Sequence, residues 1–470
     1  MNNSSCDPNA HPLRWLVLAL VCVGTFMATL DISIVSIALP RLTELFHTTP
    51  STTQWVVLSY TFVITILLLT FGKLGDLIGR RRIYTYGIII FVIGSLLCGF
   101  STSILMLILA RALQGIGSSM TMSAGPAFVT EGFPARERGK ALGFVGTAVA
   151  LGLLTGPMIG GILVEYTSWR WIFFLNVPIG LVLAILLTTR VHGFDMNMDG
   201  KLDTRGAVLM AITIAALLFG LTFGNRLGWT SPATISIFLS AVILAAVFVR
   251  VEKQIENPVL NLELFRNRGF MVAAVAGWAN YAAIIPVSVF MPFYLENLLK
   301  YSPGKVGLIL AFGPITLAIF APVAGSLSDK IGYRLLTSVG LFIAGLAVFS
   351  MRMLTPTSTW IDVAWRLVLA SFGSALFVSP NSSSIMGSVK CEDMGIASGT
   401  IALVRNLGMV CGVALAGAII ATVSRNTHIA ATRDIAFFQG LKAAFIACAA
   451  ISFFGSLTSS LRTSITPTAK

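Results

Sequence analysis

Long runs of apolar residues, separated by short polar segments, make up most of this chain. A helix needs about 20 such residues to cross the roughly 30 Å of hydrocarbon in a bilayer. Fourteen runs are long enough, and they lie near residues 14–39, 53–72, 83–101, 104–127, 138–163, 170–190, 205–224, 231–250, 270–294, 304–325, 334–353, 360–385, 395–423 and 438–460. The pattern predicts an all-α integral membrane protein with fourteen transmembrane helices.

The polar segments predict how these helices are oriented. If both termini are cytoplasmic, 20 of the 32 Lys and Arg residues lie in inner loops and tails and nine lie in outer loops. Three more, Arg111, Arg366 and Arg405, fall inside apolar runs. Lys and Arg are enriched in cytoplasmic loops. We therefore expect a multi-pass protein of the cytoplasmic (inner) membrane with both termini inside.

Composition argues against several other classes of protein. Only 11% of the residues are charged, against about 25% in soluble domains, so the surroundings are expected to be membrane lipid. The net charge of +13 forms no contiguous basic face that could hold nucleic acid. The six cysteines and four histidines show no metal-ligand spacing and no nucleophile–base pair. We expect no metal, no cofactor and no enzymatic activity.

An internal repeat divides the chain. The charged segment GKLGDLIGRRR, Gly72–Arg82, recurs in weaker form as GSLSDKIGYR, Gly325–Arg334. Pro126 and Arg111 have counterparts in Pro380 and Arg366 at nearly the same offset. Repeats of this kind indicate duplicated structural units. They predict a six-helix bundle in residues 1–190, an inserted helix pair in 191–268 and a second six-helix bundle in 269–470.

Five motifs occur in order along the chain. They are LDISIVSIALP (Leu30–Pro40), the Gly72–Arg82 loop, RALQGIG (Arg111–Gly117), GLLTGPMIGG (Gly152–Gly161) and WRWIFFLNVPIG (Trp169–Gly180). With them the chain resembles the major facilitator superfamily, and within it the fourteen-span drug:proton antiporters of the EmrB/QacA type. The resemblance implies a major facilitator fold. It also implies efflux of amphipathic small molecules by alternating access between the two bundles.

Asp31 and Arg111 are the candidates for proton coupling. Asp31 lies nine residues before Pro40, and Arg111 lies eight residues after Ser103. At 1.5 Å per residue both charges sit roughly 12–13 Å deep. A charge at such a depth costs about 2.5–3.5 kcal/mol and marks a functional candidate. Burial favours the protonated acid and the arginine favours the charged one, so conformational change could load and unload a proton. The alternative is a permanent structural ion pair.

The charged loop after the second predicted helix is a candidate cytoplasmic gate. Its glycines allow a tight turn, and Asp76 can accept hydrogen bonds from nearby donors. The resemblance implies that the loop latches the two halves together. The candidate gate residues are Gly72, Asp76, Arg80, Arg81, Glu131, Arg138 and Asp329. The alternative is that the arginines only set the topology.

The fifth predicted helix carries glycines at four-residue spacing, Gly152, Gly156 and Gly160, with Pro157 and Gly161 beside them. Small residues at this spacing let helix backbones approach closely in lipid. The resemblance makes this the antiporter helix, packed against the second half of the molecule. Simple helix packing would use the same contact.

Aromatic and amide side chains inside the apolar runs are the candidates for the substrate path, because polar groups are costly against lipid. They are Tyr60, Gln114, Trp278, Asn280, Tyr281, Phe290, Tyr294, Asn381, Arg405 and Asn406. The sequence names no acidic partner for Arg405, so the predicted cavity is not acidic. This favours neutral, zwitterionic or anionic substrates over lipophilic cations.

Two transporter hypotheses follow from the sequence. The first is a proton-coupled exporter of amphipathic small molecules, with the proton gradient as its energy source because the chain has no phosphate-binding P-loop. The second is a dedicated exporter of one neutral, zwitterionic or anionic metabolite, siderophore or lipid. In both, the expected partners are the small substrate and membrane lipid, and the chain is expected to act as a monomer.

Overall fold

The computed structural model describes residues 11–192, 204–228, 231–254, 266–387, 394–426 and 433–461, and every regular element in this part of the chain is helical. The first half contains α1 (Arg14–Leu45), α2 (Pro50–Thr53), α3 (Trp55–Ile78), α4 (Arg80–Gly99), α5 (Ile104–Gly132), α6 (Ala135–Tyr166), α7 (Trp171–Phe174) and α8 (Asn176–Thr189). Two further helices follow, α9 (Thr204–Leu227) and α10 (Pro232–Glu252).

The second half contains α11 (Arg268–Phe293), a π-helical turn η2 (Tyr294–Leu298), α12 (Pro303–Ile331), α13 (Tyr333–Ser350), a 3₁₀ turn η3 (Met351–Met353), α14 (Trp360–Gly387), α15 (Met394–Asn426) and α16 (Arg433–Ser460). Thirteen helical segments of the described chain are long and apolar enough to cross a membrane. In α9 the qualifying apolar stretch, Arg205–Leu221, is shorter. Every one of the fourteen predicted runs therefore corresponds to a helix.

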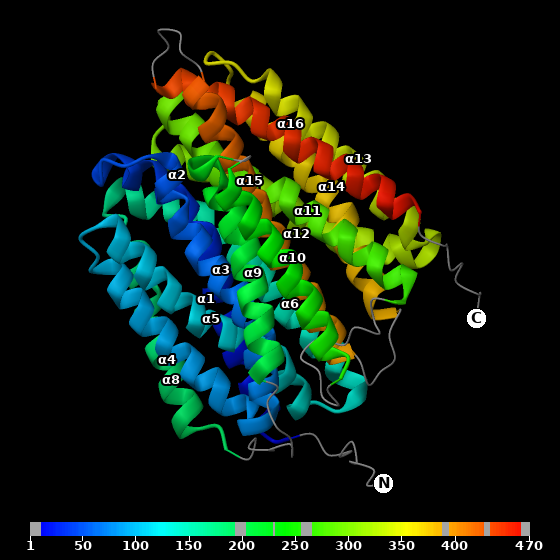
Figure 1. Cartoon of the computed structure of the whole chain (residues 1–470). Helices are drawn as coiled ribbons and strands as arrows, with labels where there is room; N and C mark the ends of the chain where they lie inside the picture. Colours follow the sequence, from blue (N-terminus) through cyan, green and yellow to red (C-terminus); the bar gives the residue numbers. More distant parts are fainter. Residues whose placement is uncertain are drawn as a thin grey trace.

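The long helices run back and forth between two ends of the molecule. We call the end at which α1 begins the Arg14 face, and the end at which it finishes the Leu45 face. Figure 1 shows the helices of the first half at the lower left and those of the second half at the upper right. The pair α9 and α10 passes across the front of this view.

Glycine makes the same turn in each half. Gly79 joins α3 to α4 with φ of 102°, and Gly332 joins α12 to α13 with φ of 83°. Residues other than glycine rarely adopt this left-handed backbone. The two turns occupy matching positions in the two charged segments of the repeat, which explains why glycine stands at both.

Close backbone contact holds α4 against α5. A Cβ atom on Gly87 would lie 2.8 Å from the carbonyl oxygen of Gly117, and one on Gly94 would lie 2.7 Å from the backbone nitrogen of Gln114. Such an approach is open only to residues without a side chain. It brings Gln114, a residue of the candidate site, directly against α4.

The two halves are in contact along three pairs of helices, in which α6 packs along α12, α3 along α15 and α1 along α11. This contact reaches the Leu45 face. Glu165 at the end of α6 accepts hydrogen bonds from the backbone nitrogen of Gly304, at 2.6 Å, and from Ser302 Oγ, at 3.1 Å, both at the start of α12. The helix α9 packs against both α3 and α15 and so lies beside the contact between the halves.

Large apolar side chains cover the sides of the molecule. Leu109, Ile162, Val242 and Ile319 are 54–66% exposed. In a soluble protein a continuous apolar surface of this kind would be an aggregation hazard. In a bilayer these side chains face the hydrocarbon.

Candidate functional site

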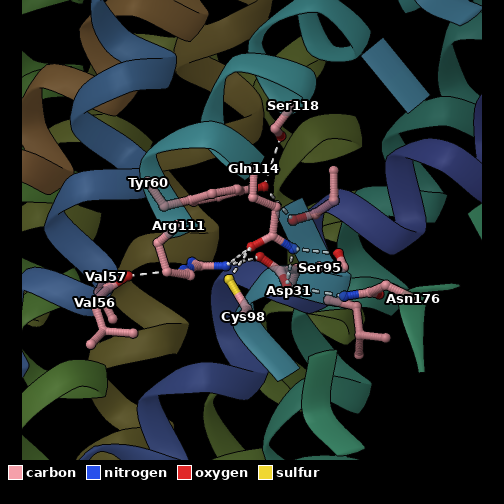
Figure 2. A network of polar contacts seen from close by, with 12 residues as sticks. Asp31, Val56, Val57, Tyr60, Ser95, Cys98, Arg111, Gln114, Ser118 and Asn176 are labelled. Carbon is pink, nitrogen blue, oxygen red and sulfur yellow. Dashed lines mark hydrogen bonds and ion pairs between the residues drawn. The ribbon is translucent and has the colours of Figure 1, made fainter. Parts of the chain in front are cut away.

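A buried ion pair lies at the centre of the first bundle. The Arg111 Nη1 group of α5 donates to Asp31 Oδ2 of α1, and neither side chain is exposed. Figure 2 shows that the side chains of several other helices converge on this pair. Ions in such surroundings are stabilised only when further hydrogen bonds compensate for the lost water.

Amides supply the remaining hydrogen bonds of the carboxylate. Gln114 Nε2 and Asn176 Nδ2 each donate to Asp31 Oδ1 at 3.0 Å. Gln114 also donates to Ser95 Oγ at 2.8 Å and accepts from Arg111 Nη1 at 2.6 Å. The carboxylate of α1 is thus bound by α5 and α8, and Gln114 links it to Ser95 of α4 (Figure 2).

The guanidinium group of Arg111 is surrounded by residues of α3. Its Nε donates to the Val56 carbonyl of α3 at 2.9 Å, and its central carbon lies 4.1 Å from the ring centre of Tyr60. The Tyr60 hydroxyl donates to Ser118 Oγ at 2.7 Å. Arg111 Nη2 and Asn176 Oδ1 have no hydrogen-bond partner in the part of the chain that the structure describes, although both are buried. The network therefore joins five helices and is still not fully satisfied.

This arrangement can act as a charge switch. Protonation of Asp31 would remove its charge and leave Arg111 buried without a counterion, which is strongly unfavourable. Because the pair binds helices α1, α3, α4, α5 and α8, the bundle would have to repack in response. One proton can therefore be linked to a change of helix packing.

Asp31 and Arg111 lie together, at the equal depth that the sequence predicted. Tyr60 and Gln114, which were predicted to line the substrate path, are fully buried within the network in this conformation. Ser95 and Asn176 were missed. Asn176 stands inside the WRWIFFLNVPIG motif, where an amide in an apolar stretch could have marked it.

Three of the predicted substrate residues line a small cavity in the second bundle. Tyr281 of α11, Asn381 of α14 and Arg405 of α15 surround about 20 Å³ of space, together with Ser382 and Thr400. The volume suits about one water molecule. Arg405 has no acidic partner in the described part of the chain.

The other predicted substrate residues belong to the packed interior. Phe290 is 1% exposed and lies within the hydrophobic core in this conformation. The ring of Tyr294 stacks on Phe438, and its hydroxyl donates to the Thr355 carbonyl at 2.6 Å. Helices that are apolar all round do not reveal from sequence which side faces the centre.

Trp278, Asn280 and Asn406 line neither the cavity at Arg405 nor the larger cavity described below. Trp278 packs against the core, and the two asparagines are 1% and 3% exposed. Both amide atoms of Asn280 and the Nδ2 atom of Asn406 lack partners. Their assignment to the substrate path is therefore not supported in this conformation.

The described part of the candidate gate is bound to its own half. Arg80 lies 3.9 Å from Glu131 and donates to the Ala127 carbonyl at 3.2 Å, and Arg81 donates to the Leu187 carbonyl at 3.3 Å. Gly72 packs near Ser123 of α5. The side chains of Asp76, Arg138 and Asp329 lie outside the described part of the structure.

The helix predicted as the antiporter helix, α6, packs along α1 of its own half and along α12 of the second half. Cβ atoms on Gly152, Gly156 and Gly160 would collide with α1, so these three glycines face the first half. A Cβ atom on Gly161 would lie 3.1 Å from Gly304 Cα of α12, and the Pro157 carbonyl lies against Gly307. The three glycines of α6 thus allow close packing within the first bundle, and Gly161 allows close packing between the two halves.

Comparisons with known proteins agree with this architecture. The family model described as Major Facilitator Superfamily matches residues 21–196, 204–413 and 274–468. The chain is 36% identical over 402 residues to the riboflavin transporter RibZ of Clostridioides difficile (strain 630), which covers 85% of this chain and 87% of that one.

Two other relatives show a similar level of likeness. The uncharacterised transporter YebQ of Escherichia coli (strain K12) is 33% identical over 89% of this chain and 92% of its own length. The multidrug resistance protein Stp of Mycobacterium tuberculosis (strain ATCC 25618 / H37Rv) is 32% identical over 86% of this chain and 76% of its own.

A solved structure shares the fold. It is a crystal structure of a bacterial homologue of the human lysosomal transporter Spinster, with a TM-score of 0.69 and 16% identity over 96% of this chain and 97% of that one. The sequence relatives, the apolar helices and the matched family model point the same way. This chain therefore belongs to the Major Facilitator Superfamily and is a multi-pass membrane transporter, not an enzyme.

Proposed function

We propose that the chain is a proton-coupled exporter of amphipathic small molecules that works by alternating access in the cytoplasmic membrane. The observation that carries this proposal is the Asp31–Arg111 ion pair, which is fully buried in a network that joins five helices of the first bundle. An intramembrane ion pair with unsatisfied neighbours is a site at which one proton can alter helix packing. The proton gradient supplies the energy, and no cofactor takes part.

In this mechanism Asp31 exchanges protons when the bundles separate and expose it. The halves meet at the Leu45 face, where Glu165 binds the start of α12. We assign this face to the outside, because the Lys- and Arg-rich loops gather at the Arg14 face. In this conformation the outer route is closed, and the ion pair is shielded from water on that side.

The Gly72–Arg82 loop is the proposed latch of the opposite state. Here Arg80 and Arg81 bind carbonyl groups and Glu131 within the first half. When the Arg14 face closes, the same loop would come against the second half. Asp76, Arg138 and Asp329 are the proposed charged partners in that state, and a single chain is the proposed functional unit.

Transport into proteoliposomes under an imposed pH gradient tests the coupling. Ethidium, a planar cation, and riboflavin, a neutral planar molecule, serve as probes. Asp31→Asn should reduce gradient-driven transport about tenfold or more, because the variant has no proton to exchange, while probe binding remains. Asp362→Asn is the matched control, since Asp362 also lies beside an arginine, 3.9 Å from Arg366, but is 44% exposed.

Gradient-driven transport that persists unchanged in Asp31→Asn would refute the coupling role. A loss of equal size in Asp362→Asn would mean that the assay reports general damage to charged pairs. Size-exclusion profiles and thermal unfolding of both variants separate misfolding from lost coupling.

The charges within the membrane favour a second candidate, a dedicated transporter of one neutral or anionic metabolite. Asp31 is compensated by Arg111, and Arg405 lines the cavity of the second bundle beside Tyr281 and Asn381. A cavity with an uncompensated cation is unfavourable for lipophilic cations. The 36% identity to a riboflavin transporter makes riboflavin the first metabolite to test.

Competition between the two probes separates the candidates. A multidrug exporter should carry both ethidium and riboflavin, whereas a dedicated transporter should carry riboflavin alone. Arg405→Gln should then improve ethidium transport relative to riboflavin.

A further inference from the structure

A large cavity opens at the Leu45 face, away from the ion pair. It encloses about 950 Å³ between the ends of α1, α2 and α3 on one side and η2, α15 and α16 on the other. We call this space the Leu45 vestibule. Its volume lies near the upper end of the range of about 300–1,000 Å³ found for small-molecule sites. Both halves of the transporter and the inserted pair contribute to it.

Gln54 forms part of the vestibule where the halves touch. It precedes α3, is 3% exposed and points its amide at Gly417 of α15, where a Cβ atom would collide with that amide. The Oε1 atom is buried and has no hydrogen-bond partner among the described residues. A buried acceptor left unsatisfied is unfavourable. A ligand that donates a hydrogen bond here would satisfy it and at the same time enter the contact between α3 and α15.

The neutral polar groups of the wall continue from Gln54. Thr43, Ser51, Asn297 and Ser424 line the same space. Together they offer hydroxyl and amide groups from α1, α2, η2 and α15. Such groups can bind several hydroxyl or carbonyl groups of a ligand without requiring a charge.

The charged groups of the wall balance one another. The titratable side chains that line the vestibule are Glu44, His47, Lys300, Arg425 and Asp434. Lys300 lies 3.9 Å from Asp434. The two acidic side chains of the lining, Glu44 and Asp434, equal in number the two basic ones, Lys300 and Arg425, so with His47 neutral the wall carries no net charge. It is suited to a neutral ligand.

An aromatic corner completes the vestibule, and the inserted helix α9 supplies half of it. The rings of Trp55 of α3 and Phe223 of α9 lie 5.4 Å apart between centroids, at 33°. Phe219 lies behind, 4.3 Å from Phe223, and is not part of the lining. Figure 1 shows α9 in front of α3. Aromatic faces of this kind favour stacking with a planar ring.

We propose that the Leu45 vestibule is a second substrate site, which binds neutral planar aromatic molecules bearing hydroxyl or amide groups, with α9 of the inserted pair as its aromatic wall. The site deepens the proposed function, since it names a substrate class and places its binding next to the closed contact between the halves. It also assigns a role to the insertion between the two repeats.

Protection of an introduced thiol tests the site in the full chain in proteoliposomes. Ser51→Cys is labelled with a membrane-impermeant maleimide, with riboflavin as the probe and tetraphenylphosphonium, a cation without hydrogen-bonding groups, as the comparison. Riboflavin should protect this thiol, and tetraphenylphosphonium should not. A thiol at the exposed loop position Thr357, introduced as Thr357→Cys, should be labelled equally with and without riboflavin.

A second substitution, added to Ser51→Cys, tests which side chains of the vestibule bind riboflavin. Phe223→Leu and Gln54→Ala, each added to Ser51→Cys, should raise the riboflavin concentration for half-protection about tenfold, the loss expected for one stacking or buried polar contact. Phe219→Leu is the matched control and should change it less than about twofold. Leucine keeps the apolar bulk, so the fold of α9 is preserved.

No protection by riboflavin, equal protection by tetraphenylphosphonium, or an unchanged half-protection concentration in Phe223→Leu would overturn the site. These outcomes measure ligand binding and do not depend on proton coupling at Asp31. Gradient-driven transport that persists unchanged in Asp31→Asn, with riboflavin protection of the thiol retained, would overturn the proton mechanism alone.

Discussion

At the scale of single residues, the chain concentrates its unfavourable electrostatics in one place. Asp31 and Arg111 are both 0% exposed, and the groups that compensate them are amides, a hydroxyl and a backbone carbonyl. Replacing one member of such a network leaves its partners buried and unsatisfied. Gln114 is the most connected neutral member, because it bonds to Asp31, Arg111 and Ser95.

Gln114→Ala should lower the free energy of unfolding by about 1–3 kcal/mol, since it removes buried hydrogen bonds to two donors, Arg111 and Cys98, and to two acceptors, Asp31 and Ser95. Thermal unfolding of the detergent-solubilised protein measures the effect. Gln439→Ala is the control, because Gln439 is exposed on α16 and its removal should change stability by less than about 0.5 kcal/mol. Equal stability of the two variants would show that the network contributes nothing to folding.

The depth of Asp31 and Arg111 could be read from the sequence, but their neighbours could not. Counting residues from the helix ends gives the depth of a side chain in the membrane. The equal depth of Asp31 and Arg111 predicted that the two charges could meet. Helix rotation decides whether a side chain faces a neighbour, the centre or lipid, and an apolar run carries little record of rotation. For this reason the sequence did not show that Phe290 and Tyr294 pack into the core in this conformation, and it did not single out Asn176 and Gln54.

At the scale of helices, small residues determine which pairs approach closely. The glycines of α4 and α5 bring the two backbones into contact, and those of α6 do the same with α1. The spacing of the α6 glycines predicted a close contact but not its partner, since small residues can admit any helix. The identity of that partner required the three-dimensional arrangement.

Gly117→Ala should destabilise the protein by about 1–3 kcal/mol through overpacking, because the new Cβ would lie 2.9 Å from Phe91 Cα. Gly146→Ala is the control, since nothing lies within 4 Å of its Cβ position on α6. In that helix alanine should be neutral or stabilising by about 0.5–1 kcal/mol. If the two variants unfold at the same temperature, the α4–α5 contact is looser than described.

At the scale of the whole molecule, one exposed residue helps to hold the two halves closed. Glu165 binds the first turn of α12, where the unpaired backbone N–H groups favour an anion. Its contribution is modest because it is exposed to solvent. Transport requires that such a contact can break.

Glu165→Ala should favour opening at the Leu45 face by about 0.5–1 kcal/mol, or roughly two- to fivefold. Labelling of Leu163→Cys, a partly buried position on α6, by an impermeant maleimide should increase accordingly. Glu137→Ala is the control, because Glu137 pairs with Arg14 at 3.5 Å within the first half. An increase with Glu137→Ala but not with Glu165→Ala would contradict this account of the closed contact.

The glycine turns at Gly79 and Gly332 show that the two bundles still share one backbone plan. Their chemistry has diverged. Arg366, the counterpart of Arg111, binds backbone carbonyls and lies beside Asp362, and the stretch that corresponds to Asp31 is the apolar Ile284–Val287. If protons drive this transporter, they act only on the first bundle. The second bundle then moves because it is in contact with the first.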